Sequence, residues 1–212
     1  MKNKNLKYWV IKVDFLIYFV LSFKFYILKL GNLERTLIAE KPLVLLNSRH
    51  LTGILLVGDL GYLIFPEYNN LLSIRITSES IALYFSIIII VVVFLLSRHS
   101  AKNKCKESTP VVLTNKKRGW IYFVIRIVFL FTYEYFFRGI LFFSLLNSFS
   151  LFWAIYVCTT LYVLIHIFDS KPVIVGAIPF GIVLCLLTFY TQSVWVPFII
   201  HCTLSSVDLI CL

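Results

Sequence analysis

The chain has 212 residues, of which 60% are hydrophobic and 17% are aromatic, and its mean hydropathy is +0.91. Soluble domains are usually about 45–50% apolar, so this composition excludes a soluble globular protein and predicts a single integral membrane domain. The net charge of +10 does not indicate nucleic-acid binding, because the Lys and Arg residues fall between apolar runs, where they suit loops that face an anionic leaflet of the lipid bilayer.

The first half of the chain contains apolar runs of unequal quality. Residues 9–30 predict a transmembrane helix, with an interfacial amphipathic helix as the alternative, because charged side chains interrupt the run. In the run from 43 to 65 only residues 51–65 are free of strong interruptions, and this is short of the ~20 residues that a span needs. That run predicts a short helix or a re-entrant element. Residues 80–97 carry no charge and predict a transmembrane helix.

Residues 98–118 form the long polar stretch of the chain, with many Lys and Arg residues against a single Glu107. Such an excess of positive charge predicts a cytoplasmic loop, and the basic N-terminus is predicted to lie on the same side of the cell inner or plasma membrane. Two segments on one side require an even number of crossings between them. Residues 9–30 and 80–97 supply two crossings, so residues 43–65 are expected to be a half-span.

Four apolar runs with short joints follow the polar stretch: residues 120–146, 150–168, 172–190 and 193–211. Short joints predict that consecutive helices are antiparallel neighbours. We therefore expect an all-α polytopic transmembrane bundle of about six to seven spans. Within one membrane domain, residues 1–118 are expected to supply the N-terminal transmembrane segments and the basic loop, and residues 119–212 a four-helix core.

The ionisable residues inside the last four runs are the candidates for function. Glu134 and Arg138 are spaced i, i+4, so a helix places both on one face and close enough to pair. A charged group at that depth costs roughly 2.5–3.5 kcal/mol and usually faces a protein interior or a wet cavity. The pair therefore indicates a functional site, with a structural ion pair between helices as the alternative.

Two histidines lie in the same half of the chain. His166 stands near the end of the second run, and His201 shares a helix face with Ser205 and Asp208 in the fourth. We expect Glu134, His166 and His201 to meet in a cavity open to the cytosol. A carboxylate with two imidazoles suits water activation, but two histidines with a glutamate also form a known catalytic zinc set. Whether a metal is needed is left open by the sequence. Arg126 is interpreted as a packing or snorkelling residue.

From Glu134 to about Asp208 the chain resembles the CPBP (Abi/CAAX protease) family of intramembrane peptidases, whose motifs EExxxR, FxxxH and Hxxx(N/D) lie on separate transmembrane helices. Three stretches carry the resemblance, in order: Glu134-Tyr-Phe-Phe-Arg138-Gly139, Tyr162-Val-Leu-Ile-His166 and Trp195-Val-Pro197-Phe-Ile-Ile-His201. The first resembles the second half of EExxxR, the second resembles FxxxH with Tyr for Phe, and the third resembles the approach to the last motif.

The resemblance implies peptide-bond hydrolysis inside the bilayer, on a peptide or membrane-protein substrate. It implies the following roles: Glu134 as general base, Arg138 as the group that orients it, His166 as the residue that positions the water, and His201, helped by Ser205, as the residue that stabilises the oxyanion. The family includes CAAX-type proteases that trim prenylated C-termini and bacterial members tied to bacteriocin self-immunity. Both a metallopeptidase and a metal-free glutamate mechanism have been argued for it.

Two positions depart from the family pattern. Tyr133 stands where the family has its first glutamate, and Ser205 stands where it has asparagine or aspartate. These departures favour one alternative, a catalytically impaired pseudopeptidase that acts as a membrane binding or immunity protein. The buried ionisable groups favour a second alternative, a small transporter or proton relay. Retention of Glu134, Arg138 and the histidines favours the peptidase.

Overall fold

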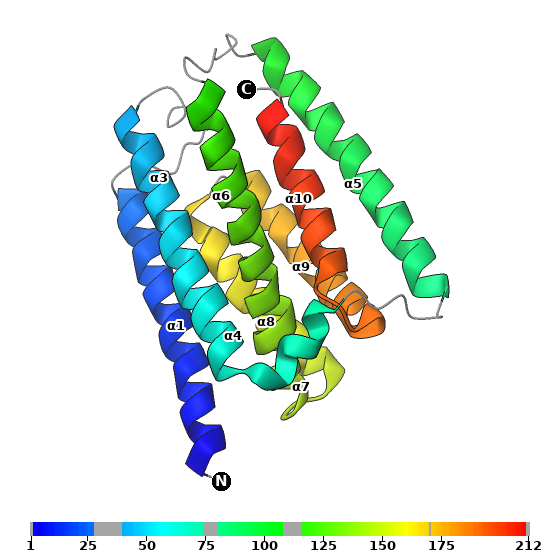
Figure 1. The fold of residues 1–212 in the computed structure, drawn as a ribbon. Coiled ribbons are helices and arrows are strands. Elements are labelled where there is room, and N and C mark those ends of the chain that lie inside the picture. Colours follow the sequence, from blue (N-terminus) through cyan, green and yellow to red (C-terminus); the bar gives the residue numbers. More distant parts are fainter. Residues whose placement is uncertain (1, 28–39, 74–79, 108–115, 170, 211–212) are drawn as a thin grey trace.

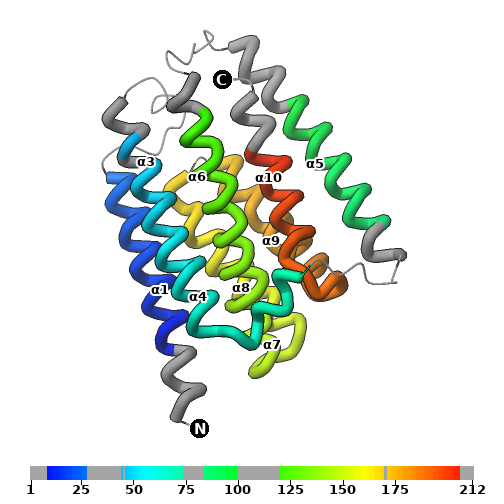
Figure 2. The backbone as a smooth tube through the Cα atoms, in the orientation of Figure 1, coloured from blue at the N-terminus to red at the C-terminus, as the bar shows by residue number. Residues whose placement is uncertain are grey.

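A computed structural model of the protein describes residues 2–27, 40–73, 80–107, 116–169 and 171–210. Most of these residues are coloured along the tube in Figure 2, and the helix ends whose side chains are not described are grey. Every element in these ranges is a helix, which confirms the predicted all-α bundle. Helix α6 (Lys116–Glu134) runs through the middle of the bundle, with the N-terminal helices on one side of it and the C-terminal helices on the other (Figure 1).

The N-terminal part is a pair of helical arms that lie next to each other in Figure 1. Its elements are α1 (Lys2–Ile27), α3 (Glu40–Gly53), the π-helical η1 (Ile54–Asp59), α4 (Leu60–Ile64) and the 3-10 helix η2 (Pro66–Leu72). Between α4 and η2 the axis bends by 111°, where Pro66 lacks the N–H that a continuing helix would use. The bent pair is a broken span or a re-entrant loop, in keeping with the short or re-entrant element expected at residues 43–65.

Helix α5 (Ser80–Glu107) begins at the predicted position but is longer than predicted. It continues through the first ten residues of the expected polar loop, and α6 begins at Lys116, so residues 98–118 are not one loop. Lys, Arg and Glu are good helix formers, and nothing in this stretch before Pro110 breaks a helix. Residues 108–115, the remainder of the predicted loop, lie outside the part of the chain that the structure describes.

The C-terminal part follows the predicted sequence of apolar runs. Its elements after α6 are η3 (Tyr135–Leu141), α7 (Phe142–Leu146), α8 (Leu151–Ile165), η4 (His166–Phe168), α9 (Lys171–Thr191) and α10 (Trp195–Ile210). Helices α6, η3 and α7 form one continuous rod from residue 116 to residue 146. α8 and α9 lie behind this rod in Figure 1, and α10 packs beside it together with α5.

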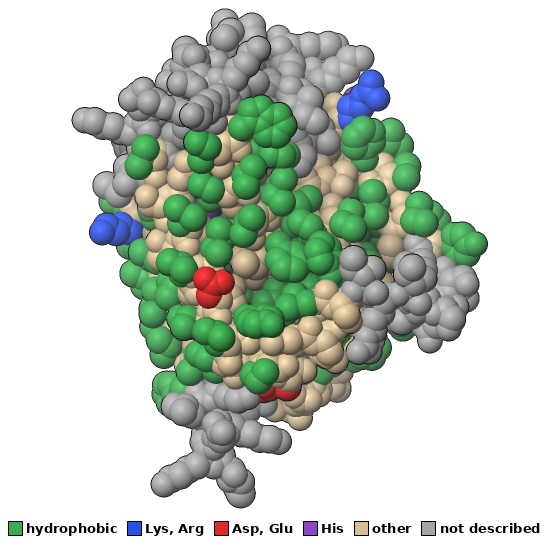
Figure 3. Space-filling view, viewed as in Figure 1, with side chains coloured by type: hydrophobic (Ala, Val, Ile, Leu, Met, Phe, Trp, Pro, Cys, Tyr) green, Lys and Arg blue, Asp and Glu red, His purple; other side chains and the backbone are tan. Residues whose placement is uncertain are grey.

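Three helices of the described residues are long and apolar enough to cross a membrane, and up to four if the bent pair is one span. They are Trp120–Leu146, Leu151–Phe168 and Lys171–Thr191, and two shorter apolar helices cover Tyr84–His99 and Trp195–Ser205. The expected six to seven spans therefore stay a prediction. On the face drawn in Figure 3, apolar side chains are spread widely and charged ones are few, as suits a surface in contact with lipid tails.

Close helix packing in the core depends on glycine at two places. A Cβ atom at Gly181 of α9 would lie 3.0 Å from Thr159 Cγ2 and 3.3 Å from Tyr162 Cδ1, both on α8. A Cβ atom at Gly58 of η1 would lie 2.5 Å from Thr132 Cγ2 on α6. Small residues let the backbones approach at these contacts. The first contact fixes the position of Tyr162, which borders the candidate site.

Candidate active site

The site is built on the point where α6 becomes π-helical. Glu134 is the last residue of α6, and Arg138 lies in the following turn, η3. Arg138 Nε lies 3.6 Å from Glu134 Oε2, and both side chains are fully buried. The prediction that one helix face carries both groups is confirmed, and the two opposite charges offset each other's cost of burial. π-Helical turns inside α-helices occur frequently at functional sites.

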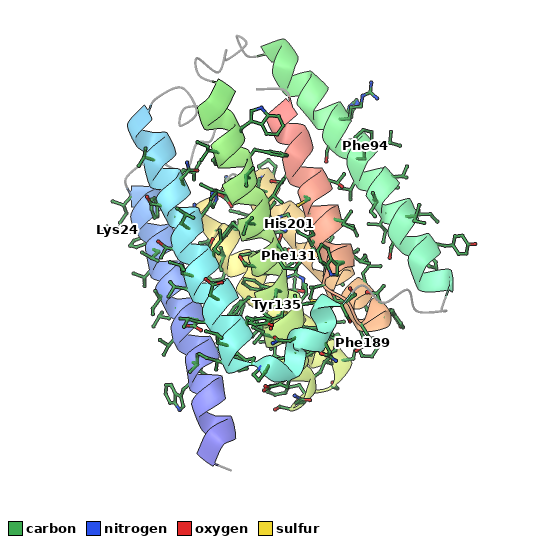
Figure 4. All side chains as sticks on the ribbon, in the orientation of Figure 1. Lys24, Phe94, Phe131, Tyr135, Phe189 and His201 are labelled. Atoms are coloured by element: carbon green, nitrogen blue, oxygen red, sulfur yellow. The ribbon has the colours of Figure 1, made fainter. Side chains whose placement is uncertain are left out.

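A third helix completes this group. His201 of α10 lies with Nδ1 2.6 Å from Glu134 Oε1, and Figure 4 places it on the side of α10 that faces α6. An ionised carboxylate only accepts hydrogen bonds, so opposite an ionised Glu134 it is His201 Nδ1 that carries the proton. The rings of Tyr133 and Phe180 pack edge-on against the imidazole, with centroids at 6.1 and 5.5 Å. The imidazole is thus held in one orientation, and Nε2 points away from Glu134.

His166 lies near this group but does not bond to Glu134. It stands at the end of α8, where the helix tightens into the 3-10 turn η4, and its Nδ1 lies 2.7 Å from Asp169 Oδ2. Its Nε2 is buried and has no hydrogen-bond partner among the described residues. The expected meeting of three groups is therefore observed for Glu134 and His201, while His166 is fixed separately by Asp169.

The Tyr162 ring connects His166 to the rest of the group. The Arg138 guanidinium carbon lies 4.5 Å from the centre of this ring, at a distance typical of a cation–π contact. The His166 ring lies 4.8 Å from it and the His201 ring 6.4 Å, centroid to centroid. Sequence reasoning treated Tyr162 only as the variant of a motif phenylalanine. Its position one turn before His166, facing the arginine, is the signal that could have identified it.

Several polar atoms of the group have no hydrogen bond within the described part of the chain. They are Glu134 Oε2 and all three side-chain nitrogens of Arg138, in addition to His166 Nε2. Buried polar groups are nearly always hydrogen-bonded in native proteins, so this concentration of atoms without partners makes the group the candidate site for a bound water or substrate.

Ser205 lies one turn after His201 on α10, but its hydroxyl has a different partner from the one that the resemblance implied. Its Oγ accepts hydrogen bonds from Arg126 Nε at 2.9 Å and from Arg126 Nη2 at 2.6 Å, and Arg126 Nη1 donates to the Tyr122 hydroxyl at 2.8 Å. Ser205 is thus a partner of Arg126, and no hydrogen bond to His201 is observed. Arg126, interpreted from the sequence as a packing or snorkelling residue, is a partly buried hydrogen-bond donor. The side chain of Asp208 lies outside the described residues.

Tyr133 occupies the position of the family's first glutamate but does not replace it. Its side chain is 3% exposed, and its hydroxyl is buried without a hydrogen-bond partner among the described residues. The ring packs against Tyr18 of α1 and against Phe137 and Tyr162. Consecutive residues point about 100° apart around a helix, so the Tyr133 hydroxyl does not take the place of the Glu134 carboxylate, and the Tyr133 ring meets the His201 imidazole at an interplanar angle of 73°.

A bound metal ion would need several donor side chains around one point. No group of three or more His, Cys, Asp and Glu side chains among them is arranged to hold a metal ion. Glu134 and His201 use one oxygen and one nitrogen on each other, and His166 uses Nδ1 on Asp169. The zinc set considered from the sequence does not fit this arrangement, and no step of the chemistry below is derived through a metal.

One of three comparisons with known proteins gives a match. Residues 115–207 match the family model described as Type II CAAX prenyl endopeptidase Rce1-like. Neither the search of curated proteins nor the search of solved structures gives a match. The apolar helices and the family match together indicate an integral membrane protein. Over residues 115–207, the chain is therefore similar to the Rce1-like type II CAAX prenyl endopeptidases of the CPBP family.

Proposed function

We propose that the protein is a CAAX-type intramembrane endopeptidase that hydrolyses a peptide bond with a water activated by Glu134. The match to the Rce1-like family supports this class of activity in general. The observation that carries the proposal is the state of the Glu134 carboxylate. It is fully buried, its Oε1 is held by His201, and its Oε2 is left without a hydrogen bond. One oxygen is thus fixed and the other is free to take a proton.

The first step uses Glu134 as general base. Oε2 accepts a proton from a water molecule while the water oxygen forms a bond to the carbonyl carbon of the substrate. Arg138 keeps the carboxylate ionised and oriented from 3.6 Å away. His166, whose ring is held by Asp169, positions the water through its free Nε2.

The second step breaks the peptide bond. Protonated His201 donates one hydrogen bond from Nδ1–H to Glu134 and one from Nε2–H to the oxyanion that forms on the carbonyl oxygen, and it keeps both protons. Glu134 then returns the proton it took from water to the leaving nitrogen as the carbon–nitrogen bond breaks. Ser205, which was expected to help His201, is hydrogen-bonded to Arg126 and has no part in this step.

The substrate would be a peptide or membrane protein that reaches the site from the lipid phase or from the cytosol. We place the protein in the cell inner or plasma membrane, with the N-terminus and the basic segment 98–118 on the cytoplasmic side. The basis is the positive charge of these two segments, since positive charge favours the cytoplasmic side.

The test is cleavage of a farnesylated peptide that ends in a Cys-aliphatic-aliphatic-Met sequence by the purified full chain, followed by mass spectrometry. Glu134→Gln keeps the size of the side chain and removes the base, so the rate should fall by roughly 10²–10⁴-fold. Asp59→Asn removes an exposed carboxylate of η1 and should leave the rate unchanged. Equal rates for the wild type and Glu134→Gln would refute the mechanism.

A catalytically impaired binding or immunity protein is the second candidate. The observation that favours it is the pair of departures from the motif pattern: the Tyr133 hydroxyl is unpartnered, and the Ser205 hydroxyl is occupied by Arg126. Tyr133→Phe separates the two candidates, because it removes only the hydroxyl. A peptidase should keep its rate in Tyr133→Phe and lose it in Glu134→Gln. If the wild type and Glu134→Gln protect cells equally in a bacteriocin-protection assay, the binding role is favoured.

A further inference from the structure

A second polar cluster lies on α6 before the active site, and we call it the cationic cluster. It consists of Arg126 of α6 with Arg49 and His50 of α3. The His50 ring stacks on Phe129 with centroids 4.7 Å apart and lies 5.8 Å from the Tyr122 ring. Arg126 Nη1 donates to the Tyr122 hydroxyl at 2.8 Å, so Arg126 and His50 meet at the Tyr122 side chain. Arg49 precedes His50 on α3.

The cationic cluster has no described counter-ion. The ion pairs found among the described residues involve Glu134 and Asp169, and none reaches Arg49 or Arg126. The hydrogen bonds that the cluster makes go to neutral hydroxyls, from Arg126 to Ser205 and Tyr122 and from Arg49 Nη2 to Ser22 Oγ at 3.1 Å. Charges inside an apolar environment are normally paired, so two arginines whose described hydrogen-bond partners are all hydroxyls are suited to bind an anion.

The cationic cluster also has donors to spare. Arg49 Nε and His50 Nδ1 are buried and have no hydrogen-bond partner in the described part of the chain. A guanidinium has five N–H donors, and the three bonds from Arg126 leave two of its donors unused. Arginine donors match a carboxylate in geometry and bind it with charge-assisted hydrogen bonds. The ligand that fits these unused donors is thus a small anionic group with two or more acceptor oxygens.

The position of the cationic cluster relative to the active site indicates which anion. Arg126 precedes Glu134 by eight residues of one helix, a rise of about 12 Å. Ser205, which Arg126 binds, follows His201 by one turn of α10, so both helices place the cluster on the same side of the active site.

We infer that the cationic cluster binds the free C-terminal carboxylate of the peptide substrate. This inference rests on the proposed function. In a CAAX sequence three residues follow the prenylated cysteine, and three extended residues span about 10 Å. With the scissile carbonyl at Glu134 and His201, the terminal carboxylate falls at the level of Arg126. The cationic cluster would therefore select substrates by the distance between the cleaved bond and the chain end.

The inference is tested by binding in the absence of turnover. The full chain with Glu134→Gln, in detergent, is titrated with two farnesylated peptides that end in the same Cys-aliphatic-aliphatic-Met sequence, one with a free carboxylate and one with a terminal amide. The amide should bind about tenfold more weakly or worse, which is the order of affinity contributed by a hydrogen bond between charged groups. Adding Arg126→Gln should reduce this preference to less than about threefold by weakening carboxylate binding alone.

Two further variants make the result specific to the cationic cluster. Arg126→Lys keeps the charge without the fork of donors and should retain part of the preference for the carboxylate. Arg98→Gln removes an exposed arginine of α5 and should retain all of it. If the Arg126→Gln protein does not fold, Arg49→Gln tests the same cluster from α3, and a preference that persists in it overturns the inference.

The outcomes also separate this inference from the proposed function. If the wild type cleaves both peptides equally well, the carboxylate site is refuted while the peptidase stands. If neither peptide is bound or cleaved, both proposals fail. If vesicles of phosphatidylglycerol abolish the preference by competing for Arg126, the cluster is a lipid-phosphate site and the inference is overturned.

Discussion

Two groups of charged side chains lie two turns apart on the same side of the bundle, and they differ in how their buried charges are compensated. In the active-site group, Glu134 lies between Arg138 and His201, so a negative charge faces two potential positive ones. In the cationic cluster, the described hydrogen-bond partners of Arg126 and Arg49 are hydroxyls. Among the described residues, opposite charges meet in the first group, whereas no carboxylate pairs with the arginines of the second.

The difference teaches what each group is suited to do. A closed set of opposite charges is pre-organised and keeps its geometry whether or not a substrate is present, as general-base chemistry requires. An open set with unused donors gains stability only when an anion binds, as a recognition site requires. Together they would measure a fixed length of substrate between a reacting bond and a charged end.

The largest effect on stability is expected when the ion pair between Glu134 and Arg138 in the active-site group is broken. Arg138→Met leaves the fully buried Glu134 carboxylate without its guanidinium partner and should lower the free energy of unfolding by about 3–5 kcal/mol. Thermal unfolding of the full chain in detergent measures this. Adding Glu134→Gln to Arg138→Met should recover part of the loss, because the carboxylate that lost its partner is removed as well. A double variant no more stable than the single one would mean that the pair is not coupled.

A smaller effect on stability is expected when Arg126 of the cationic cluster is replaced. Arg126→Met leaves the Ser205 and Tyr122 hydroxyls without a donor and should cost about 1–3 kcal/mol. The loss stays below that of Arg138→Met because no described carboxylate is stranded and the repulsion from Arg49 is relieved. The same unfolding measurement applies. A loss as large as that of Arg138→Met would show that both arginines are held in the same way and would end the comparison.

The smallest effect on stability is expected at the edge of the active site. Asp169→Asn weakens the hold on His166 at a half-exposed pair, where an ion pair is usually worth less than about 1 kcal/mol. The cleavage rate should nevertheless fall by up to about tenfold, because the water-positioning ring loses its fixed orientation. The measurement is the rate of peptide cleavage at unchanged unfolding temperature. A parallel fall in rate and stability would make Asp169 a merely structural residue.

Some of the site could be predicted because its signals are local. The spacing of Glu134 and Arg138 determines their pairing on any helix, so periodicity alone predicted it. The four apolar runs predicted four helical stretches for the same reason. The start of the predicted loop was placed wrongly, because charged residues form helices as readily as they form loops, and α5 continues to Glu107.

Other parts of the site depended on contacts between distant segments. Ser205 is 79 residues from Arg126 in the chain, and nothing in either residue's local sequence indicates that they pair. His166 was expected to meet Glu134. Its Nδ1 instead bonds to Asp169, the nearest carboxylate after the end of the helix. The role of Tyr162 depends on how closely α9 approaches at Gly181, which no single helix specifies.

The sequence by itself therefore determined that this is a helical membrane protein and that Glu134 and Arg138 share a helix face, because hydrophobic length and the helical repeat are properties of one segment. Only the tertiary structure decided that His201 bonds to the Glu134 carboxylate and that Ser205 bonds to Arg126. It also decided that Arg49 and His50 lie close to Arg126. These depend on how helices pack, and in a bundle whose surfaces are all apolar, packing follows from shape at each contact and not from a pattern along the chain.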